Sequence, residues 1–461
     1  MKRPSCCILA AIIAATCDAD QIDKVIAKAM AAQHIPGASV AVLIHGRAIK
    51  QRSYGFSDLE QKVKATNQSA YMVGSVSKQF ESTALLQLAD EGRLKLDDPI
   101  TKYLDGLPKA WSGITIRHLM THTSGLKDYV GLPEHDQSQA KPVTPKQIME
   151  WVGRYPLEFT PGTQWKYCNT GSYLEGLIIE KVTGKSYEEF AKSKLWRPLG
   201  MRSTRLNRWK DDIPNRAKGY AWGKGGREKP TFEDDTWPWA GGGVVTTLED
   251  LVKWVQWLGS KPSNNRLWKP VQLAGSGSYP FGLDWFISDQ RGTPRMFRTG
   301  GINGFSAILM RYPAHDITVI LLTNEDGVPV RAFAEEIAQA VDPSLVPPHA
   351  LAERPDPDNA MTDRITQALA DISASNLDSK AATNALVSST TNEDKQGIGM
   401  ALRAHAKFHF LAEDDMRSHS VERLGSEIAR IRHYRIEVGP MKLVKGFYLD
   451  NEGRLAFVQD E

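Results

Sequence analysis

The hydrophobic positions of the chain change their period several times, and each period predicts a different element. Two apolar runs at residues 38–44 and 48–54 flank a polar turn at 45–47, which predicts a β-hairpin near the start of the fold. Farther on, apolar residues recur at intervals of three and four, which predicts a helix over residues 75–90 with one buried face. Gly92 follows this stretch and is expected to end the helix.

The middle of the chain is mainly helical in pattern, and strands return after it. The clearest helical segments are residues 116–120, 146–153 and 172–183. Two strand-like runs follow at residues 307–311 and 317–323, and a further helix is expected over residues 330–341. Because strands stand at both ends with helices between them, the pattern predicts one sheet built from distant segments together with a helical subdomain. This is an α+β organisation.

A proline-rich segment divides the chain into two predicted parts. Five prolines lie between residues 343 and 357, and such a segment is typical of a stiff, exposed linker. We therefore expect residues 343–361 to connect a large domain, residues 20–342, to a small α+β module, residues 362–461.

The pattern within the last hundred residues predicts two helices and then strands. Helical spacing marks residues 365–372 and 400–411, and the alternation that follows leads to a hairpin around residues 450–453. Three potential metal ligands share one face of the second predicted helix: His405, His409 and Glu413. Three polar side chains on one helix face more often form a solvated surface, so we predict no metal site there.

The first nineteen residues have the pattern of a secretory signal. Two basic residues precede an apolar stretch over residues 6–15, and small residues continue to Ala19, which we take as the last residue of a removed segment, residues 1–19. Ten apolar residues are too few to span a bilayer. We therefore expect an exported protein without a membrane span, periplasmic or secreted. The alternative is a lipid anchor on Cys17.

Composition excludes several classes of protein. Hydrophobic residues make up 41% of the chain and charged residues 24%, which is ordinary for a globular protein and excludes general disorder. The formal net charge of +3 is too small to indicate a nucleic-acid partner. Removal of the predicted signal segment leaves Cys168 as the only cysteine, so no internal disulfide is expected.

Candidate chemistry begins at Ser75 and Lys78, at the start of the first predicted helix. A serine hydroxyl is a poor nucleophile until a base removes its proton, and a lysine three residues along a helix lies on the same face. Burial and the positive end of the helix both disfavour the ammonium form of that lysine. The same helix end offers N–H groups to a developing oxyanion. The alternative is a helix cap followed by a surface lysine, because this spacing is common by chance.

Other segments in the right order strengthen the pattern. The four motifs are Ser75-Val76-Ser77-Lys78, residues 114–126 (ITIRHLMTHTSGL), Tyr167-Cys168-Asn169 and Arg298-Thr299-Gly300. Together they resemble the serine β-lactamase and penicillin-binding protein superfamily, specifically its class C β-lactamase-like branch, over roughly residues 22–342. The resemblance implies a β-lactamase/transpeptidase-like α+β fold, in which helices flank an antiparallel sheet and a helical subdomain adjoins it. It implies no metal and no cofactor.

The resemblance also implies a role for each matched residue. Ser75 is the expected acylated nucleophile, Lys78 its base, and Tyr167 a phenol that shares the proton transfer. Ser75 and Gly301 are expected to supply the oxyanion hole. The expected substrate-binding residues are Asn169, Arg298, Thr299, Gly300 and Gly301. In an extended segment Cys168 points away from its two neighbours, so we predict that it packs in the core and is not a nucleophile.

Arg298 departs from the lysine or histidine that the family has at this position. A guanidinium keeps a positive charge that can hold a substrate carboxylate at the mouth of the cleft, but it cannot exchange protons. We therefore expect substrates that bear a free carboxylate to be preferred. The alternative is a salt bridge between Arg298 and a neighbouring acid that merely holds the strand.

The sequence thus predicts an exported serine hydrolase that acts through an acyl-enzyme on Ser75. Amides, D-amino-acid peptides, esters and β-lactams all pass through the same kind of intermediate, so the expected partner is a small-molecule or peptide substrate. The alternative is a catalytically idle protein that binds peptidoglycan or another partner in the same cleft. Because the matched motifs end before the proline-rich linker, we expect the module at 362–461 to be dispensable for the chemistry.

Overall fold

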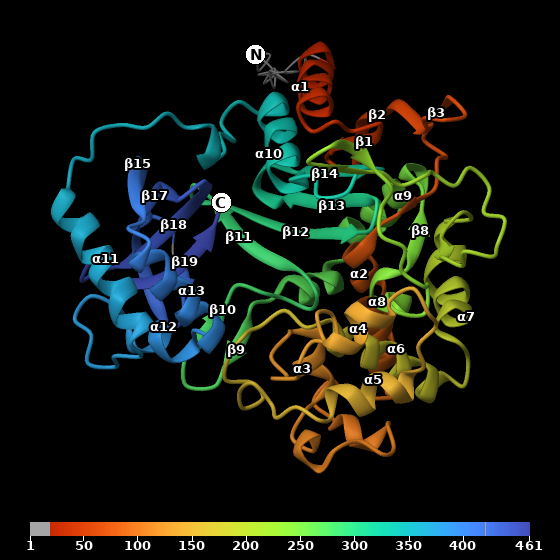
Figure 1. Ribbon diagram of the computed structural model, residues 1–461, viewed down its shortest axis with the longest axis horizontal. Coiled ribbons are helices and arrows are strands. Elements are labelled where there is room, and N and C mark those ends of the chain that lie inside the picture. The colour runs from red at the N-terminus through yellow and green to blue at the C-terminus, as the bar shows by residue number, and fades with distance from the viewer. Residues whose placement is uncertain (1–18, 420) are drawn as a thin grey trace, which may run out of the picture.

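The computed structural model describes residues 19–419 and 421–461 (Figure 1). The predicted signal segment therefore lies outside the described residues except for Ala19, and so does Cys17. Helix α1 spans Ala19–Ala32. No helix in the described ranges has both the length and the apolar content that are needed to cross a bilayer.

A seven-stranded antiparallel sheet forms the centre of the large domain, with strand order β11-β12-β13-β14-β1-β2-β3. Its strands are β1 (Gly37–Ile44), β2 (Arg47–Asp58), β3 (Val63–Lys64), β11 (Phe286–Gln290), β12 (Thr293–Ile302), β13 (Phe305–Tyr312) and β14 (Ile317–Thr323). The predicted first hairpin is confirmed as β1 and β2. The sheet joins distant segments as predicted, because β1 pairs with β14 over residues 38–44 and 317–323.

Alternate residues of the central strands point to two separate hydrophobic cores. Val40 and Val42 of β1 face a core that includes α1 and α10 (Val330–Val341), while Ala41 and Leu43 face the opposite core. Figure 1 shows α1 and α10 beside each other over one face of the sheet. Helix α9 (Leu248–Ser260) and the helical subdomain cover the other face.

The helical subdomain contains the helices that the middle of the sequence predicts. Its members are α2 (Lys78–Asp90), α3 (Ile116–Met120), α4 (Pro133–Ser138), α5 (Pro145–Val152), α6 (Asn169–Thr183), α7 (Tyr187–Ala191) and α8 (Trp239–Gly242). The short strands beside it are β4 (Tyr71–Met72), β5 (Arg205–Leu206), β6 (Ala221–Gly223), β7 (Gly226–Glu228) and β8 (Val244–Thr246). The prediction of one buried face for α2 is wrong. Residues 78–86 are all buried, because α6 and α8 pack against the sides of α2.

The last hundred residues form three helices and an antiparallel sheet in the order β15-β17-β18-β19, with β16 paired to β17. The elements are α11 (Asn359–Ser373), α12 (Asn384–Ser389), α13 (Asn392–Arg403), β15 (Lys407–Asp415), β16 (Glu422–Arg423), β17 (Ser426–Val438), β18 (Met441–Asp450) and β19 (Leu455–Asp460). The predicted terminal hairpin is confirmed as β18 and β19.

The helix predicted over residues 400–411 is wrong. Helix α13 ends at Arg403, and β15 begins at Lys407. His409 and Glu413 therefore lie on a strand, which rises more than twice as far per residue as a helix. The spacing of four residues that brings side chains together on a helix consequently separates these two.

The C-terminal elements share buried contacts with the large domain. Strands β9 (Val271–Leu273) and β10 (Gly277–Tyr279) belong to the large domain, yet Leu273 is part of the hydrophobic cluster of the C-terminal elements. Tyr279 packs edge-on against Phe457 of β19.

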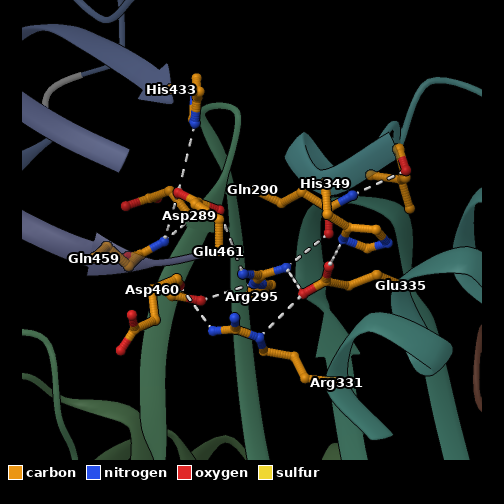
Figure 2. A network of polar contacts seen from close by, with 12 residues as sticks. Asp289, Gln290, Arg295, Arg331, Glu335, His349, His433, Gln459, Asp460 and Glu461 are labelled. Atoms are coloured by element: carbon orange, nitrogen blue, oxygen red, sulfur yellow. Dashed lines mark hydrogen bonds and ion pairs between the residues drawn. The ribbon is translucent and has the colours of Figure 1, made fainter. Parts of the chain in front are cut away.

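A polar network extends this boundary to β12, as Figure 2 shows. Arg295 of β12 pairs with Glu335 of α10 at 2.5 Å, and its other terminal nitrogen lies 3.9 Å from the carboxylate of Glu461. Arg331 donates a hydrogen bond of 2.8 Å to the carbonyl of Asp460. These contacts bear against the expectation that the last hundred residues are dispensable, because β12 also carries Arg298.

Candidate active site

Ser75 lies in a single 3₁₀ turn, η1 (Gly74–Ser77), at the N-terminal end of α2. The turn and the helix together place Ser75 and Lys78 on the same side, one turn apart. Gly74 has a φ of +50°, and a Cβ at this position would lie 2.7 Å from the carbonyl oxygen of Gly301. Only glycine therefore allows β12 to approach Ser75 this closely.

The Lys78 side chain is buried and makes three hydrogen bonds. Its Nζ lies 3.2 Å from Ser75 Oγ, 3.0 Å from Asn169 Oδ1 and 2.8 Å from the carbonyl oxygen of Gly241. The last two groups can only accept hydrogen bonds from the amine. These two acceptors hold Nζ beside Ser75 Oγ.

Tyr167 and Asn169 approach the same point from the segment that leads into α6. The hydroxyl of Tyr167 donates a hydrogen bond of 2.8 Å to Ser75 Oγ. Cys168 between them is buried and donates a weak hydrogen bond to the carbonyl of Leu126, and burial raises the pKa of its thiol to about 12. The prediction that Cys168 packs in the core is confirmed.

Asp128 fixes the orientation of Asn169. The amide nitrogen of Asn169 donates a hydrogen bond of 2.9 Å to Asp128 Oδ2, so its oxygen must face Lys78. Burial raises the pKa of Asp128, although the hydrogen bonds that it accepts oppose this effect. Asp128 thus holds the amide that contacts Lys78.

Arg298 occupies a place that differs from the prediction. Its side chain is fully buried, its Nε donates a hydrogen bond of 2.8 Å to the carbonyl of Ser75, and its Nη2 donates one of 2.9 Å to Tyr167 Oη. Strand β11 pairs with β12 only as far as Phe297, so the edge of β12 from Arg298 onward is free to face η1. The guanidinium thus lies behind Tyr167 and not at the cleft mouth.

The remaining predicted residues of β12 divide between its two faces. Gly300 lies on the same face as Arg298 and packs against the backbone of Val73 and Ser75, where no side chain would fit. Thr299 is half-buried on the opposite face. Gly301 is exposed, and a Cβ there would meet no atom within 4 Å. Gly301 therefore faces open space beside Ser75.

A cavity of about 350 Å³ opens in front of Ser75. Lys78, Tyr167, Asn169 and Gly301 line it together with Ser75. The cavity wall also includes Tyr129, Val130, His135, Gln139, Tyr173, Glu233 and Pro238. Among the described residues that line the cavity, the ionisable ones besides Lys78 and the tyrosines are His135 and Glu233.

His135 and Glu233 neutralise each other in this wall. His135 Nε2 lies 3.0 Å from Glu233 Oε1, and Nδ1 lies 3.2 Å from Asp136. Burial opposes a charge on His135, but the two carboxylates outweigh it and raise the pKa of the imidazole. His135 is therefore not a free cation for a substrate carboxylate.

Three buried carboxyl groups lie behind Lys78, and we call Glu81, Glu175 and Asp284 the buried acid cluster. Burial raises the pKa of Glu81 and Glu175 well above the usual range, and it raises the pKa of Asp284 to about 6. Ser82 donates a hydrogen bond to Asp284. Glu81 Oε2 and Lys78 Nζ each lie 3.4 Å from the position that a Gly241 Cβ would take.

The arrangement unites most of the predicted site and adds groups that sequence reasoning missed. Ser75, Lys78, Tyr167 and Asn169 converge as predicted, and the missed groups are the Gly241 carbonyl, Asp128 as an orienting acid, and the buried acid cluster. Gly241 belongs to a run of three glycines, residues 241–243, and its carbonyl accepts a hydrogen bond of 2.8 Å from Lys78. Nothing in the sequence marks Asp284, because it arrives from a distant loop.

Comparison with known proteins gives one family match and several relatives. The Beta-lactamase family model matches residues 22–342. Protein flp of Staphylococcus aureus (strain N315) is 27% identical over 333 residues, which cover 69% of this chain and 65% of the relative. The chain thus spans about 65% of the length of this relative.

Two solved structures share the fold. The D-stereospecific amidohydrolase from Streptomyces sp. is 25% identical, with a TM-score of 0.58, and the match covers 70% of this chain and 98% of that one. The octameric penicillin-binding protein homologue from Pyrococcus abyssi is 21% identical, with a TM-score of 0.60, and the match covers 94% of this chain and 97% of that one. The predicted β-lactamase-like fold is confirmed.

Proposed function

Because the chain belongs to the beta-lactamase family, we propose that it is a serine hydrolase that forms an acyl-enzyme on Ser75. The observation that carries the proposal is the convergence of Lys78 Nζ and Tyr167 Oη on Ser75 Oγ, at 3.2 and 2.8 Å. Two proton-exchanging groups within hydrogen-bond distance of one hydroxyl are what nucleophilic catalysis by serine requires. The same contacts disfavour an idle binding protein.

In the acylation step Ser75 Oγ attacks the substrate carbonyl carbon and gives up its proton. Lys78 Nζ, held by Asn169 Oδ1 and the Gly241 carbonyl, lies 3.2 Å from Ser75 Oγ and is the proposed base that takes this proton. The bond to the leaving nitrogen or oxygen then breaks, and Tyr167 supplies the proton that the leaving group needs. In deacylation water enters where the leaving group departed, and the same two groups move its protons in the opposite order.

Arg298 supports this proton traffic as a positioning residue. When Tyr167 gives its proton to the leaving group, negative charge develops on Oη, and the guanidinium at 2.9 Å stabilises that charge. The backbone N–H groups of Ser75 and Gly301 are the proposed donors to the tetrahedral oxyanion. Thr299 and Gly300 shape the strand that presents Gly301.

The substrates that suit this cavity are amides and esters without a free carboxylate next to the bond that breaks. Arg298 is buried, and His135 is paired with Glu233, so the cavity wall offers no free guanidinium or imidazolium for a carboxylate. The amide class is also supported by the likeness to the D-stereospecific amidohydrolase. The preference for carboxylate substrates that the sequence predicts is thus replaced by a preference for neutral ones.

We further propose the domain division and export that the sequence predicts. Residues 1–19 would be a signal segment, residues 20–342 the hydrolase domain, residues 343–361 a linker and residues 362–461 a C-terminal module. N-terminal sequencing of the protein from the periplasm or culture medium tests export, with Asp20 as the expected first residue. A full-length chain retained inside the cell would contradict it.

Labelling with a fluorescent fluorophosphonate tests the function. We expect a covalent adduct on the peptide that contains Ser75, and no adduct in the Ser75→Ala variant. A folded wild-type protein that neither reacts with the probe nor hydrolyses p-nitrophenyl esters or D-amino-acid anilides would refute the proposal.

A further inference from the structure

A second cavity adjoins the active-site cavity. Its volume is about 320 Å³, and four residues line both cavities: Glu233, Pro238, Ile302 and Asn303. Because the two spaces share these lining residues, the second cavity lies directly beside the space in front of Ser75.

The walls of the second cavity are mainly apolar. Met72 and Phe305 are buried and form part of its lining, together with Pro230, Pro238 and Ile302. Trp209 and Phe232 also line it, and they are 39% and 47% exposed with ring centroids 5.7 Å apart. Two exposed aromatic rings beside the candidate active site indicate a surface that binds an apolar group.

Five charged residues also line the second cavity, namely Arg216, Lys218, Lys229, Glu233 and Asp235, and three of them are held by other groups. Arg216 donates hydrogen bonds to the carbonyls of Arg208 and Asp211, and its guanidinium lies 5.6 Å above the ring of Trp209. Lys218 pairs with Glu60 at 2.9 Å. Glu233 pairs with His135, and its backbone carbonyl accepts a hydrogen bond of 2.9 Å from Trp209 Nε1. Trp209 is thus hydrogen-bonded to Glu233, which lines both cavities.

The direction of β12 indicates which part of a substrate enters the second cavity. Tyr167 is the proposed proton donor to the leaving group, and its hydroxyl is hydrogen-bonded to Arg298, at the start of residues 298–301 of β12. The second cavity begins beyond Gly301, at Ile302 and Asn303. The leaving group and the second cavity therefore lie on opposite sides of a carbonyl placed at Ser75, so the acyl part of the substrate points toward the second cavity.

We infer that the second cavity is an acyl subsite, which binds an aromatic or large aliphatic group on the acyl side of the substrate. This inference rests on the acyl-enzyme route proposed above. The substrate class is thereby narrowed to amides and esters of arylacetic, aromatic amino-acid or similarly large apolar acids. Binding there would remove the apolar acyl group from water, which is favourable because the lining of the second cavity is mainly apolar.

A pair of esters with the same leaving group tests the acyl subsite. The ratio of kcat/KM for p-nitrophenyl phenylacetate over p-nitrophenyl acetate, each divided by its rate of hydroxide hydrolysis, is expected to be about 10 or more. The double variant Trp209→Ser/Phe232→Ser should lower this ratio at least about fivefold. Trp222→Ser is the matched control, because Trp222 is an exposed aromatic residue that lines neither cavity, and it should leave the ratio unchanged.

Binding to the Ser75→Ala variant separates the acyl subsite from the proposed function. Isothermal titration with phenylacetamide should show binding at least about fivefold tighter than with acetamide, and the Trp209→Ser/Phe232→Ser changes should remove the difference. This measurement needs no turnover, so it decides on the subsite even where Ser75 fails to react. A wild-type ratio near 1 together with equal binding of the two amides would overturn the inference while leaving labelling of Ser75 intact.

Discussion

Arg298 Nη2 donates a hydrogen bond of 2.9 Å to Tyr167 Oη, and this contact joins strand β12 to the segment that leads into α6. The guanidinium is fully buried behind the phenol, and its Nε holds the backbone carbonyl of Ser75. One side chain therefore contacts both Ser75, the proposed nucleophile, and Tyr167, its proposed proton-exchanging partner. Its charge is directed at the chemistry and not at the solvent side of the cleft.

Replacing Arg298 by methionine, which fills a similar volume, should lower kcat by about 10- to 10²-fold, since a hydrogen bond to a developing charge contributes about 1.5 to 3 kcal/mol. KM should change little. The loss should be equal for a neutral ester and for its analogue with a free carboxylate, and Arg298→Lys should recover part of kcat. Steady-state kinetics on the matched pair provide the measurement, and a loss confined to the carboxylate substrate would restore the role of a direct carboxylate contact.

The Tyr167→Phe variant should separate substrates by their leaving groups. An amide nitrogen needs a proton to depart, so kcat/KM for an anilide should fall at least about 10²-fold, the usual scale for a lost acid or base. p-Nitrophenolate departs without a proton, so the nitrophenyl ester should lose less. Tyr155→Phe, at an exposed site, is the control. Equal losses for both substrates would show that Tyr167 is not the proton donor to the leaving group.

The buried acid cluster predicts how stability depends on pH. Folding raises the pKa of Glu81 and Glu175 above their values in the unfolded chain. The free energy of unfolding is therefore not reduced by these groups below about pH 4.3, where they are protonated in both states, and it falls as the pH rises above that value. Each such group costs up to about 1.4 kcal/mol per pH unit above that value while it stays protonated. The melting temperature of Glu81→Gln or Glu175→Gln, relative to wild type, should therefore rise between pH 5 and 8.

Thermal unfolding of these variants at several pH values provides the check. The Glu150→Gln variant is a suitable control because Glu150 is exposed, and its difference from wild type should not depend on pH in this way. A difference for Glu81→Gln and Glu175→Gln that stays constant from pH 5 to 8 would mean that both carboxyl groups are ionised in the folded protein.

Removal of the C-terminal elements should impair the enzyme. A chain that ends at Val346 would expose Leu273 and Tyr279 to solvent. It would remove Glu461 from Arg295, which lies three residues before Arg298 on β12. It would also remove Glu393, which pairs at 2.6 Å with Lys166 beside Tyr167. We expect kcat to fall at least about tenfold or the chain to aggregate. A monodisperse truncated protein with full kcat/KM would confirm the original expectation of dispensability.

The sequence predicted those parts of the site that local geometry determines. Ser75 and Lys78 meet because they are three residues apart at the start of a helix, and Tyr167 and Asn169 lie on one side because an extended segment alternates. The first hairpin and the sheet built from distant segments followed from short apolar runs, and the terminal hairpin followed from an alternating pattern.

The errors arose where distant segments decide the outcome. The position of Arg298 depends on where β11 stops pairing, which no pattern in β12 itself reveals. Helix α2 is buried on more than one face because α6 and α8 also pack against it. Its polar residues suggested a solvent-exposed face, so the sequence pattern did not reveal that they are buried. The short apolar stretch around Phe408 fits both a helical and a strand period, and the sheet of the C-terminal elements decided in favour of the strand.

The most direct test of the central claim is intact-protein mass spectrometry of the enzyme quenched in acid during turnover of p-nitrophenyl phenylacetate. The account predicts a transient mass increase equal to one phenylacetyl group, located by peptide mapping on Ser75, and its absence in Ser75→Ala, which should be folded but inactive. An acyl group found on another residue, or turnover that persists in Ser75→Ala, would contradict the account.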